Sequence, residues 1–470
     1  MVISNPRREE SSRHHDYIVP GLDMLIGDPN VLCPGSNTPQ KAKTFCIPKI
    51  YIRRLSDFYD ELSTRGEASK ELLTIISDLL EQGSASTGTN PVYICHLKND
   101  TKVEFHDVSV HDKESLLHSS KSHAIRLAKH LARKYRDVAI MTGSDKLSVA
   151  AALEGIDVAH INPKVYTGRV RVPLYNEAGL DLTSAWWSNQ RITLAEWMNA
   201  FPEIFLQTNQ YVEFIVDECE QDRRLIGYFN GSEIVPIKYR QLTRPDYRNI
   251  KPKTIGQQML FDALLAPPEE IPIVIVSGIF GTGKTFATLA CGLEQIEAGI
   301  YEKIFVCPRD AALGQEIGFL PGNETEKTRA KAHPIEDNLR AILRLHKQDK
   351  SPQGLDLSVD NCLNNYFQFT PMINMGGRSI ANSFIIFDEF QDTERHQAKA
   401  LLSRIGDHSK VVIMGDPTQI TNPHLNRTSN GLSYIASKLA GSPLVSVITF
   451  DDTTEVVRSR AAQAIAELLR

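Results

Sequence analysis

A glycine-rich stretch at residues 277–286, SGIFGTGKTF, has the residue types and spacing that bind a nucleoside triphosphate. It follows the apolar run IPIVIV, a predicted buried strand, and it precedes FATLACGLEQIEAG, a predicted helix. The pattern GxxxxGK followed by Ser or Thr lets backbone amides converge on phosphate oxygens at the positive end of a helix. The lysine of such a loop reaches the β- and γ-phosphates, and the next hydroxyl binds Mg²⁺.

This loop predicts that the chain binds ATP or GTP together with Mg²⁺. Lys284 is the expected phosphate-binding lysine, and Thr285 is the expected metal-binding hydroxyl. An accidental glycine-rich turn is the alternative, but the strand before the loop and the helix after it favour the phosphate site. The residues expected to contact the nucleotide are Gly278, Gly281, Thr282, Gly283, Lys284, Thr285 and Phe286.

Two acidic residues follow another apolar run, FIIFDEF, in which Asp388 and Glu389 end a predicted strand. An aspartate at this position holds the metal and its water shell, and the next glutamate acts as a base toward the attacking water. Two acids after a strand are usually only a solvated strand end, but a phosphate loop in the same chain makes that interpretation weaker. The pair favours hydrolysis over phosphoryl transfer to a small molecule.

Two other side chains could respond to the γ-phosphate. Gln419 follows the predicted strand in KVVIMGDPTQI, where a polar amide can contact the γ-phosphate and report its presence to a neighbouring surface. Arg458 begins the predicted final helix, which makes it a candidate arginine finger for transition-state charge. A plain turn and an ordinary surface arginine are the alternatives.

The elements that must position these groups alternate between strands and helices over residues 254–470. The predicted strands are the apolar runs IPIVIVSG, KIFVCP, FIIFDEF, KVVIMGD and LVSVITF. Because helical stretches separate them, we predict an α/β fold with a parallel sheet covered by helices on both faces. We expect this P-loop NTPase domain to bring Asp388 and Glu389 alongside the phosphate loop.

Three other segments precede this domain. Residues 1–14 are polar and charged, and we expect a disordered arm there. Residues 15–163 alternate strand-like runs such as PVYICHL with helical stretches such as KSHAIRLAKHLARKYRD, which predicts a second α/β domain. Residues 164–253 contain short strand-like runs joined by polar turns, which predicts a small β-rich connecting module.

The connecting module ends in KYRQLTRPDYRNIKPK, where basic and aromatic side chains are interleaved. Charges that follow phosphates and rings that stack on bases are the chemistry of single-strand binding. An extended charged linker is an equally good interpretation of the same residues. The side chains concerned are Lys238, Tyr239, Arg240, Arg244, Tyr247, Arg248, Lys251 and Lys253.

Bulk properties limit the class of protein. A chain of 470 residues is too long for one ordinary core and favours two domains. A net charge of −5 means that any nucleic-acid surface is local. Seven cysteines without a CxxC pair argue against a disulfide framework and a zinc ribbon, and they are most simply buried thiols. The sequence shows no signal peptide and no apolar run of membrane-spanning length, so we expect a cytoplasmic protein.

Together these motifs resemble those of the PhoH family of ATPases, which is similar in motif order to superfamily 1 helicases. The resemblance extends over most of the segment from Thr254 to Leu469. Its blocks include TIGQQMLFDALL, GQEIGFLPGNETEK, PMINMGGRSI, FIIFDEFQDTERHQAKALLSRIG and SKVVIMGDPTQI. So many blocks in one order make the resemblance highly specific.

The resemblance implies roles that the motifs alone do not assign. Gln257 would contact the adenine of ATP. Gln391 and Arg404 would lie near the nucleotide or link it to the substrate. Gln419 and Arg458 would act as the sensor and the arginine finger.

The chain departs from the family pattern at two motifs. The family has Asp-Glu-Ala-Gln and Met-Arg-Gly-Arg where this chain has DEFQ and MGGR. Phe390 is a bulkier substitute for the alanine. Gly376 replaces an arginine, which leaves only Arg378 to serve that site.

The N-terminal part resembles the PIN nuclease domain that precedes PhoH in two-domain members of the family. Such a domain would use carboxylates to gather one or two Mg²⁺ or Mn²⁺ ions for RNA cleavage. Here Gly21 and Ser144 stand at two of the metal positions, and Arg53 with Arg54 replaces a pair of glutamates. Because an arginine pair repels a divalent cation, we predict a PIN-like fold with a degraded nuclease centre. An unrelated α/β domain is the alternative.

We therefore predict an ATP-hydrolysing motor of helicase type that binds single-stranded RNA and uses ATP and Mg²⁺. Relatives that combine PIN and PhoH resemble ring assemblies, which implies a homo-oligomer such as a hexameric ring, with Arg458 acting across a subunit boundary. One alternative is a nucleotide-dependent switch that binds a protein partner. The other is an ATP-coupled ribonuclease with rearranged metal ligands, which would be Asp23, Asp28, Asp57 and Asp145.

Overall fold

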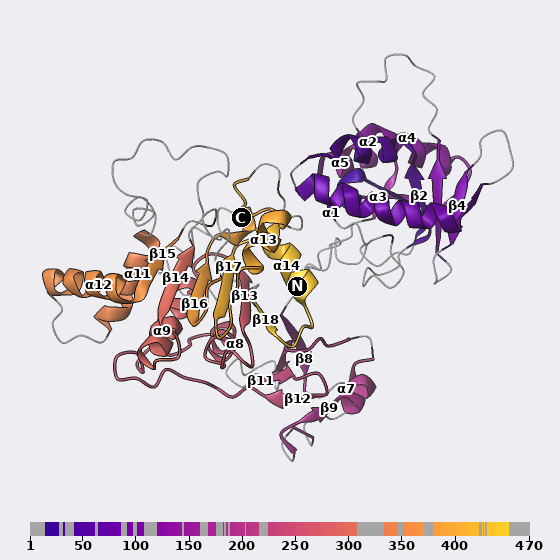
Figure 1. Ribbon diagram of the computed structural model, residues 1–470. Helices are drawn as coiled ribbons and strands as arrows, with labels where there is room; N and C mark the ends of the chain where they lie inside the picture. The colour runs from indigo at the N-terminus through magenta and orange to yellow at the C-terminus, as the bar shows by residue number, and fades with distance from the viewer. Residues whose placement is uncertain are drawn as a thin grey trace, which may run out of the picture. The chain divides into compact units, whose positions relative to one another are not determined.

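The chain forms two compact units, Met1–Val165 and Tyr166–Arg470. Figure 1 shows the computed structural model. It describes residues 15–27, 32, 42–61, 64–85, 92–96, 101–107, 120–142, 145–159, 168–174, 182, 185–186, 189–202, 204–215, 224–307, 333–345, 351–370, 372, 379–422, 425, 427 and 430–450. The predicted arm at residues 1–14 lies outside these ranges.

The first unit contains a seven-stranded sheet in the order β3-β4-β5-β2-β1-β6-β7. Neighbouring strands run parallel from β5 to β7, whereas β3 and β4 extend the sheet as an antiparallel hairpin beside β5. The strands are β1 (His15–Pro20), β2 (Ala42–Pro48), β3 (Ser84–Ala85), β4 (Tyr93–His96), β5 (Lys102–His106), β6 (Val138–Met141) and β7 (Asp157–Ala159).

Helices cover both faces of this sheet (Figure 1). Successive strand residues point to opposite faces, so Ile18 packs in one core with α1 (Leu22–Gly27), α2 (Ile50–Phe58) and α3 (Thr64–Gln82). Its neighbour Val19 packs in a second core with α4 (Ser120–Ala132) and α5 (Asp145–Leu153). The predicted α/β character of this part of the chain is confirmed.

The second unit begins with a five-stranded sheet in the order β8-β10-β11-β12-β9. Helix α7 (Leu194–Ala200) starts with a capping box between Thr193 and Glu196, and its Trp197 is buried against this sheet. The strands are β8 (Arg169–Pro173), β9 (Ile192–Thr193), β10 (Tyr211–Ile215), β11 (Arg224–Phe229) and β12 (Glu233–Pro236).

The five-stranded sheet is fastened to the rest of the second unit. Asn209 Nδ2 donates to the carbonyls of Pro443 at 2.9 Å and Val445 at 3.2 Å. Gly168 N donates to Thr449 Oγ1 at 3.2 Å, and a Cβ at this glycine would lie 1.6 Å from the carbonyl oxygen of Val447. Both segments belong to one compact unit, and their separation into domains at residues 253 and 254 stays a prediction.

A six-stranded parallel sheet in the order β15-β14-β16-β17-β13-β18 forms the centre of the second unit. Its central strands β16 and β17 are buried along their whole length and mostly apolar, as expected for a parallel sheet with two covered faces. The predicted parallel sheet is therefore confirmed. The strands are β13 (Ile273–Gly278), β14 (Lys303–Cys307), β15 (Phe367–Phe369), β16 (Ser383–Phe387), β17 (Lys410–Gly415) and β18 (Val445–Phe450).

Two sets of helices cover this sheet (Figure 1). One core contains Val274 and residues of α8 (Ile255–Leu264), α9 (Lys284–Glu297), α11 (His333–Arg344) and α12 (Pro352–Tyr366). The other contains Ile275 and residues of α13 (Arg395–Leu402) and α14 (Gly431–Leu439). The loops after β13, β16 and β17 meet at the carboxyl edge of neighbouring strands, which is where open α/β sheets bind ligands. Within the described part of the chain, no helix has the length and apolar character that a bilayer crossing requires.

Candidate nucleotide-binding site

The phosphate loop joins the end of β13 to the start of α9. Gly281 and Gly283 both have φ of +82°, in the left-handed region that favours glycine. A Cβ at Gly278 would lie 2.5 Å from Cβ of Phe450 on the adjacent strand. These three glycines are therefore required by the backbone path and by close packing, and a helix begins directly after the loop at Lys284.

The side chains of the loop are held by its own backbone. Lys284 Nζ donates to the carbonyls of Gly278 at 2.7 Å and Ile279 at 2.9 Å. The buried Thr282 hydroxyl donates to the same Ile279 carbonyl at 3.1 Å. Binding a phosphate would replace the carbonyls as partners of the ammonium. Thr285 is half-buried in the first turn of α9, and Phe286 packs against the core.

The two acids follow β16, which is separated from the phosphate-loop strand by β17. Asp388 Oδ1 accepts a hydrogen bond from the backbone N of Glu389 at 3.0 Å. Burial and the neighbouring Glu389 raise the pKa of the Asp388 carboxyl to about 6. The Lys284 ammonium acts in the opposite direction on this pKa, so the acid and the lysine are within electrostatic reach of each other. The structure thus brings the loop and the acids together.

Glu389 is held in an unusual conformation. Its φ of 53° and ψ of 38° are in the left-handed region, which costs a non-glycine residue roughly 1–2 kcal/mol. Its exposed carboxylate accepts a hydrogen bond from Gln391 Nε2 at 2.6 Å. Backbone strain of this kind persists where surrounding structure enforces it, and it concentrates at functional sites.

Gln391 connects the loop after β16 to the loop after β17. The side chain is buried, and its Oε1 accepts from the backbone N of Asp416 at 3.0 Å. Its Nε2 also approaches the carbonyl of Gln419 at 3.3 Å. A Cβ at Gly415 would lie 2.3 Å from Gln391 Oε1, so the glycine makes room for this bridge. The resemblance placed Gln391 near the nucleotide, and the structure gives it a positioning role between Glu389 and the next loop.

Replacing Gln391 with Leu is expected to destabilise the protein by about 1–3 kcal/mol, because the substitution leaves the amide of Asp416 without its partner. Urea unfolding monitored by tryptophan fluorescence measures the change. Gln397→Leu on the adjacent helix α13 is the matched control, since its side chain caps a half-exposed helix start. Equal loss in both variants would contradict the bridging role.

Asp416 ties the phosphate loop to the loop after β17, a role that the sequence did not assign to it. Its Oδ2 accepts from the backbone N of Phe280 at 3.1 Å, and its Oδ1 accepts from the backbone N of Thr418 at 2.9 Å. The available signal was its position after an apolar strand. Gln419 follows on the same turn with an exposed side chain, and its contact with a γ-phosphate stays a prediction.

Gln257 supports the phosphate loop from α8. Its Nε2 donates to the carbonyl of Thr282 at 2.9 Å, and its Oε1 accepts from the backbone N of Lys253 at 2.8 Å. A Cβ at Gly283 would lie 2.9 Å from the same Nε2. Each end of this buried amide has one partner inside the protein, and the predicted adenine contact stays a prediction.

The backbone of Arg404 lies away from the phosphate loop, and its predicted role near the nucleotide or as a link to the substrate stays a prediction. The carbonyl of Arg404 accepts from the backbone N of Ile380, which precedes the start of β16. Asp388 follows the carboxyl end of that strand. Helix α13 then carries the chain back to the amino edge of the sheet. Arg404 is therefore at the opposite edge. Arg458, Gly376 and Arg378 lie outside the described residues.

The basic and aromatic segment before α8 packs onto the second unit. Lys238 and Arg240 form ion pairs with Glu270 at 3.0 Å and 2.5 Å. The ring of Tyr247 is buried, and its hydroxyl donates to Glu297 Oε1 at 2.6 Å. These contacts hold the segment in place. Base stacking on Tyr247 is excluded because its ring is buried.

The acids predicted for a rearranged nuclease centre do not assemble in the described residues. Asp23 follows β1, where its Oδ2 accepts from the hydroxyl of Thr142 at 2.8 Å. Asp57 is exposed on α2. Asp28, Ser144 and the side chain of Asp145 lie outside the described part of the structure. Where side chains are described, no metal-binding group of three includes Asp23 or Asp57.

Comparisons with known proteins agree with this site. Residues 249–470 match the family described as PhoH-like protein. Protein PhoH2 of Bacillus subtilis is 39% identical over 221 residues, which cover 47% of this chain and 48% of that relative. Protein PhoH2 of Thermobispora bispora is 29% identical over 356 residues, or 74% of each chain, and that of Mycolicibacterium smegmatis is 28% identical over 359 residues, or 75% of this chain and 74% of the relative.

The extent of these matches differs. The chain spans about half the length of the Bacillus subtilis relative, and the two longer matches include residues beyond the PhoH-like segment. The matched family segment contains the phosphate loop, the two acids and Gln391. Residues 249–470 are therefore a PhoH-like segment that carries the phosphate loop of a nucleotide-binding P-loop protein.

Proposed function

We propose that this chain is an ATP-hydrolysing motor of helicase type that acts on single-stranded RNA. The observation that carries the proposal is the hydrogen-bonded path from Glu389 through Gln391 to Asp416 and from there to the phosphate loop. A path of this kind links the group that would activate water to the loop that would hold the triphosphate. It also reaches the loop after β17, which could pass a change in the bound nucleotide to a bound RNA strand.

The residues of the site fit a Mg²⁺ ion with a nucleotide. The Asp388 carboxylate is half-buried, and burial and Glu389 raise its pKa, so a bound cation would stabilise its charged form. The Thr285 hydroxyl and Asp388 would hold the metal, which would neutralise the charge that develops during hydrolysis. Lys284 would exchange its two carbonyl partners for phosphate oxygens. Glu389 would accept the proton of the attacking water, and Gln391 would keep its carboxylate in place.

Glu389→Gln is expected to retain nucleotide binding and to slow hydrolysis by about 10²–10⁴-fold, because the amide keeps the shape of the side chain but loses its basicity. Phosphate release and equilibrium nucleotide binding measure the two properties separately. Glu302→Gln is the matched control, since Glu302 is exposed near the amino edge of the sheet. Hydrolysis at the wild-type rate in Glu389→Gln would exclude this base.

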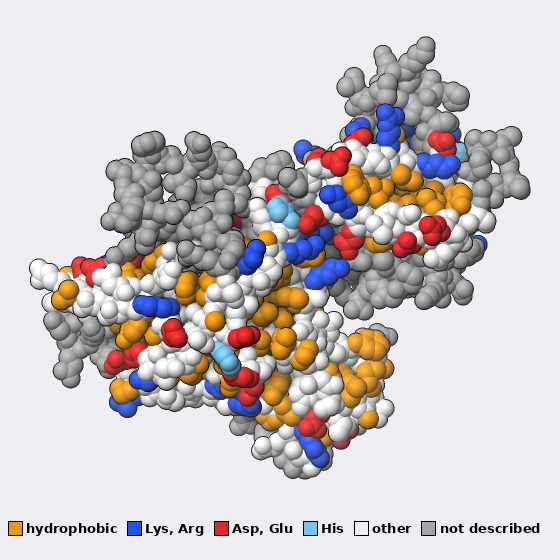
Figure 2. Space-filling model, viewed as in Figure 1, with side chains coloured by type: hydrophobic (Ala, Val, Ile, Leu, Met, Phe, Trp, Pro, Cys, Tyr) orange, Lys and Arg blue, Asp and Glu red, His pale blue; other side chains and the backbone are white. Residues whose placement is uncertain are grey.

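Support for RNA as the partner comes from a short exposed segment. Figure 2 shows basic and acidic side chains interspersed on the face that it displays, so a nucleic-acid contact would be local. The side chains of Arg248, Lys251 and Lys253 are exposed directly before α8. The backbone of Lys253 is bonded to Gln257, which holds Thr282 in the phosphate loop. A strand bound here would therefore be coupled to the nucleotide.

The ATPase rate, titrated with single-stranded RNA and separately with single-stranded DNA, tests the proposed function. We expect RNA to increase the rate more than DNA does. A rate that neither nucleic acid changes would favour the nucleotide-dependent switch. The ribonuclease alternative has less support, because Asp23 is bonded to Thr142 and no metal-binding group forms around it among the described side chains.

We also propose that the first unit is a PIN-like scaffold without a nuclease centre and that the chain assembles into a homo-oligomeric ring. The parallel strand order β5-β2-β1-β6-β7 and the position of Arg53 and Arg54 on α2 support the first part. The ring rests on the resemblance alone, with Arg458 acting across a subunit boundary. Sedimentation with nucleotide tests it, and a monomer under those conditions would contradict the ring.

A further inference from the structure

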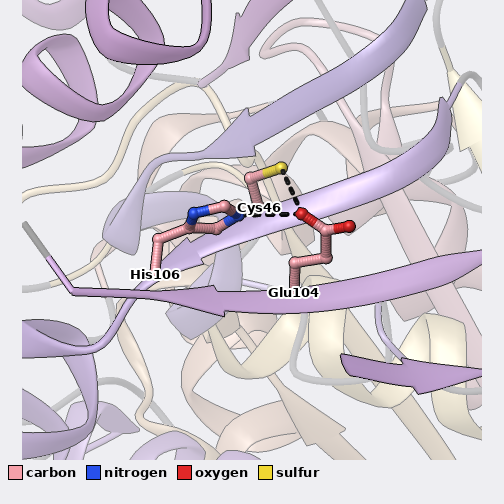
Figure 3. Close-up of side chains that lie close together, drawn as sticks. All are labelled: Cys46, Glu104 and His106. Atoms are coloured by element: carbon pink, nitrogen blue, oxygen red, sulfur yellow. Dashed lines mark hydrogen bonds and ion pairs between the residues drawn. The ribbon is translucent and has the colours of Figure 1, made fainter. Parts of the chain in front are cut away.

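Three metal-binding residue types lie together in the sheet of the first unit. Cys46 on β2 is directly opposite Glu104 on the parallel strand β5. His106 is two residues after Glu104, so both side chains are on the same face of β5. Figure 3 shows the three side chains pointing toward one another from these two neighbouring strands. The arrangement joins residues 58 positions apart in the sequence.

The distances are those of a preformed ligand set. His106 Nε2 lies 2.9 Å from Glu104 Oε2, and Cys46 Sγ lies 4.0 Å from the same oxygen. One ligand atom from each residue falls within 4.8 Å of the other two. A single ion placed between them would need only small side-chain rotations, because metal ligands stand about 2.0–2.3 Å from Zn²⁺.

The cluster is partly buried and partly reached by solvent. Cys46 is fully buried in the core that α4 covers. The side chains of His106 and Glu104 retain 13% and 17% of their exposure. An ion could therefore enter from the side of β5, and water could complete its coordination.

Ligand chemistry selects the metal. A thiolate, an imidazole and a carboxylate form a mixed S, N and O set, which is typical of Zn²⁺. Mg²⁺ and Ca²⁺ prefer sites made of oxygen ligands only. Three protein ligands leave one tetrahedral position for water.

Charge balance agrees with a divalent ion. Cys46 is a buried thiol, and a thiol must lose its proton to bind a metal ion. Binding of the ion would release that proton and form the S–metal bond, and no electron transfer is required. A thiolate and a carboxylate then offset both positive charges of the ion.

We propose that Cys46, Glu104 and His106 form a Zn²⁺ site that joins β2 to β5 and keeps one coordination position for water. This site differs from the carboxylates expected for a nuclease, because Asp23 follows β1 and contacts Thr142. It is also in a different unit from the phosphate loop. The alternative is a simple Glu104–His106 ion pair beside a buried thiol.

Cobalt binding to the full-length, metal-free chain distinguishes these possibilities. Co²⁺ alone, followed by Zn²⁺, is titrated while the thiolate-to-cobalt charge-transfer absorption is recorded. We expect one Co²⁺ per chain with this absorption and its loss when Zn²⁺ is added. Absence of the absorption in the wild-type chain would overturn the proposal.

Two ligand variants and two matched controls assign the site. Cys46→Ser should remove the absorption, and His106→Gln should weaken Co²⁺ binding by at least about tenfold. Cys95→Ser changes a buried thiol of the other core, and Asp388→Asn changes the predicted Mg²⁺ ligand, so both should keep the absorption. If Cys46→Ser does not fold, His106→Gln decides the outcome, because its side chain is not fully buried. Binding unaffected by the ligand variants, or lost equally in Cys95→Ser, would refute the site.

Discussion

Asp388→Asn is expected to make the metal-free protein more stable above about pH 7 and, at the same time, to reduce ATP hydrolysis by about 10²-fold or more. The carboxyl pKa is raised from 3.8 to about 6, first by burial and then by Glu389. Between these two pH values the folded state binds more protons than the unfolded state, so the unfolding free energy falls as the pH rises. Above pH 6 the full cost of burying the carboxylate is present.

The size of this effect follows from the pKa shift. A shift from 3.8 to about 6, which already includes the attraction of Lys284, corresponds to an upper limit of about 3 kcal/mol, and we expect a gain of about 1–3 kcal/mol. Urea unfolding from pH 4 to pH 8 measures it. Tryptophan fluorescence reports on the second unit, because Trp186, Trp187 and Trp197 all belong to it.

Asp407→Asn is the matched control for this experiment, since Asp407 is exposed at the amino edge of the sheet. We expect no comparable change in stability or hydrolysis from it. An Asp388→Asn protein that is less stable than the wild type above pH 7 would contradict the electrostatic cost. Undiminished hydrolysis in the same variant would contradict the metal-binding role.

Lys410→Met is expected to raise the unfolding free energy by about 2–4 kcal/mol near pH 7, with the gain disappearing by about pH 10. Lys410 is fully buried at the start of β17, and its ammonium donates to the carbonyl of Ala263 at 3.0 Å. Among the described residues, no carboxylate forms an ion pair with it. Burial, followed by the Arg240 guanidinium, lowers the pKa of Lys410 from 10.5 to about 7.

The pH dependence has a definite sign. Between pH 7 and 10.5 the unfolded chain binds a proton that the folded chain does not, so the unfolding free energy of the wild type rises with pH. The slope is at most about 1.4 kcal/mol per pH unit. Below pH 7 the lysine is charged in both states, and its burial cost is fully present. Lys410→Met should remove this slope, which denaturant unfolding at several pH values measures.

The exposed Lys251 provides the control, because Lys251→Met should leave the slope unchanged. A wild-type protein with no such slope would show that Lys410 stays charged in the folded state. A Lys410→Met variant that is destabilised at pH 7 would show that the hydrogen bond to Ala263 outweighs the cost of burial.

The parallel sheet could be predicted from local apolar patterns, and the grouping of Lys284 with the acids could be predicted because loops at the carboxyl ends of parallel strands meet at one edge of the sheet. Apolar runs specify strands, and the glycines of the loop specify its left-handed backbone. The partners of Gln391 could not be predicted, because they come from the loop after β17. The burial of Tyr247 could not be predicted either. Its ring is buried against α9 through tertiary packing, which the neighbouring residues in the sequence do not determine.

Residues that act together across strands were the least accessible to sequence reasoning. Cys46, Glu104 and His106 have no motif spacing, and only the parallel register of β2 and β5 brings them together. The backbone of Arg404 is at the other edge of the sheet from the phosphate loop, because α13 carries the chain there. The spacing of residues along the chain predicts neither the cluster nor the place of Arg404.

The most direct test is a crystal structure of the chain with Mg²⁺ and a non-hydrolysable ATP analogue. We predict that Lys284 Nζ leaves the carbonyls of Gly278 and Ile279 for phosphate oxygens, and that the metal lies between Thr285 and Asp388. Glu389 should face the γ-phosphate, still held by Gln391. An analogue bound elsewhere, or a metal without Asp388 in its coordination or water shell, would contradict the account.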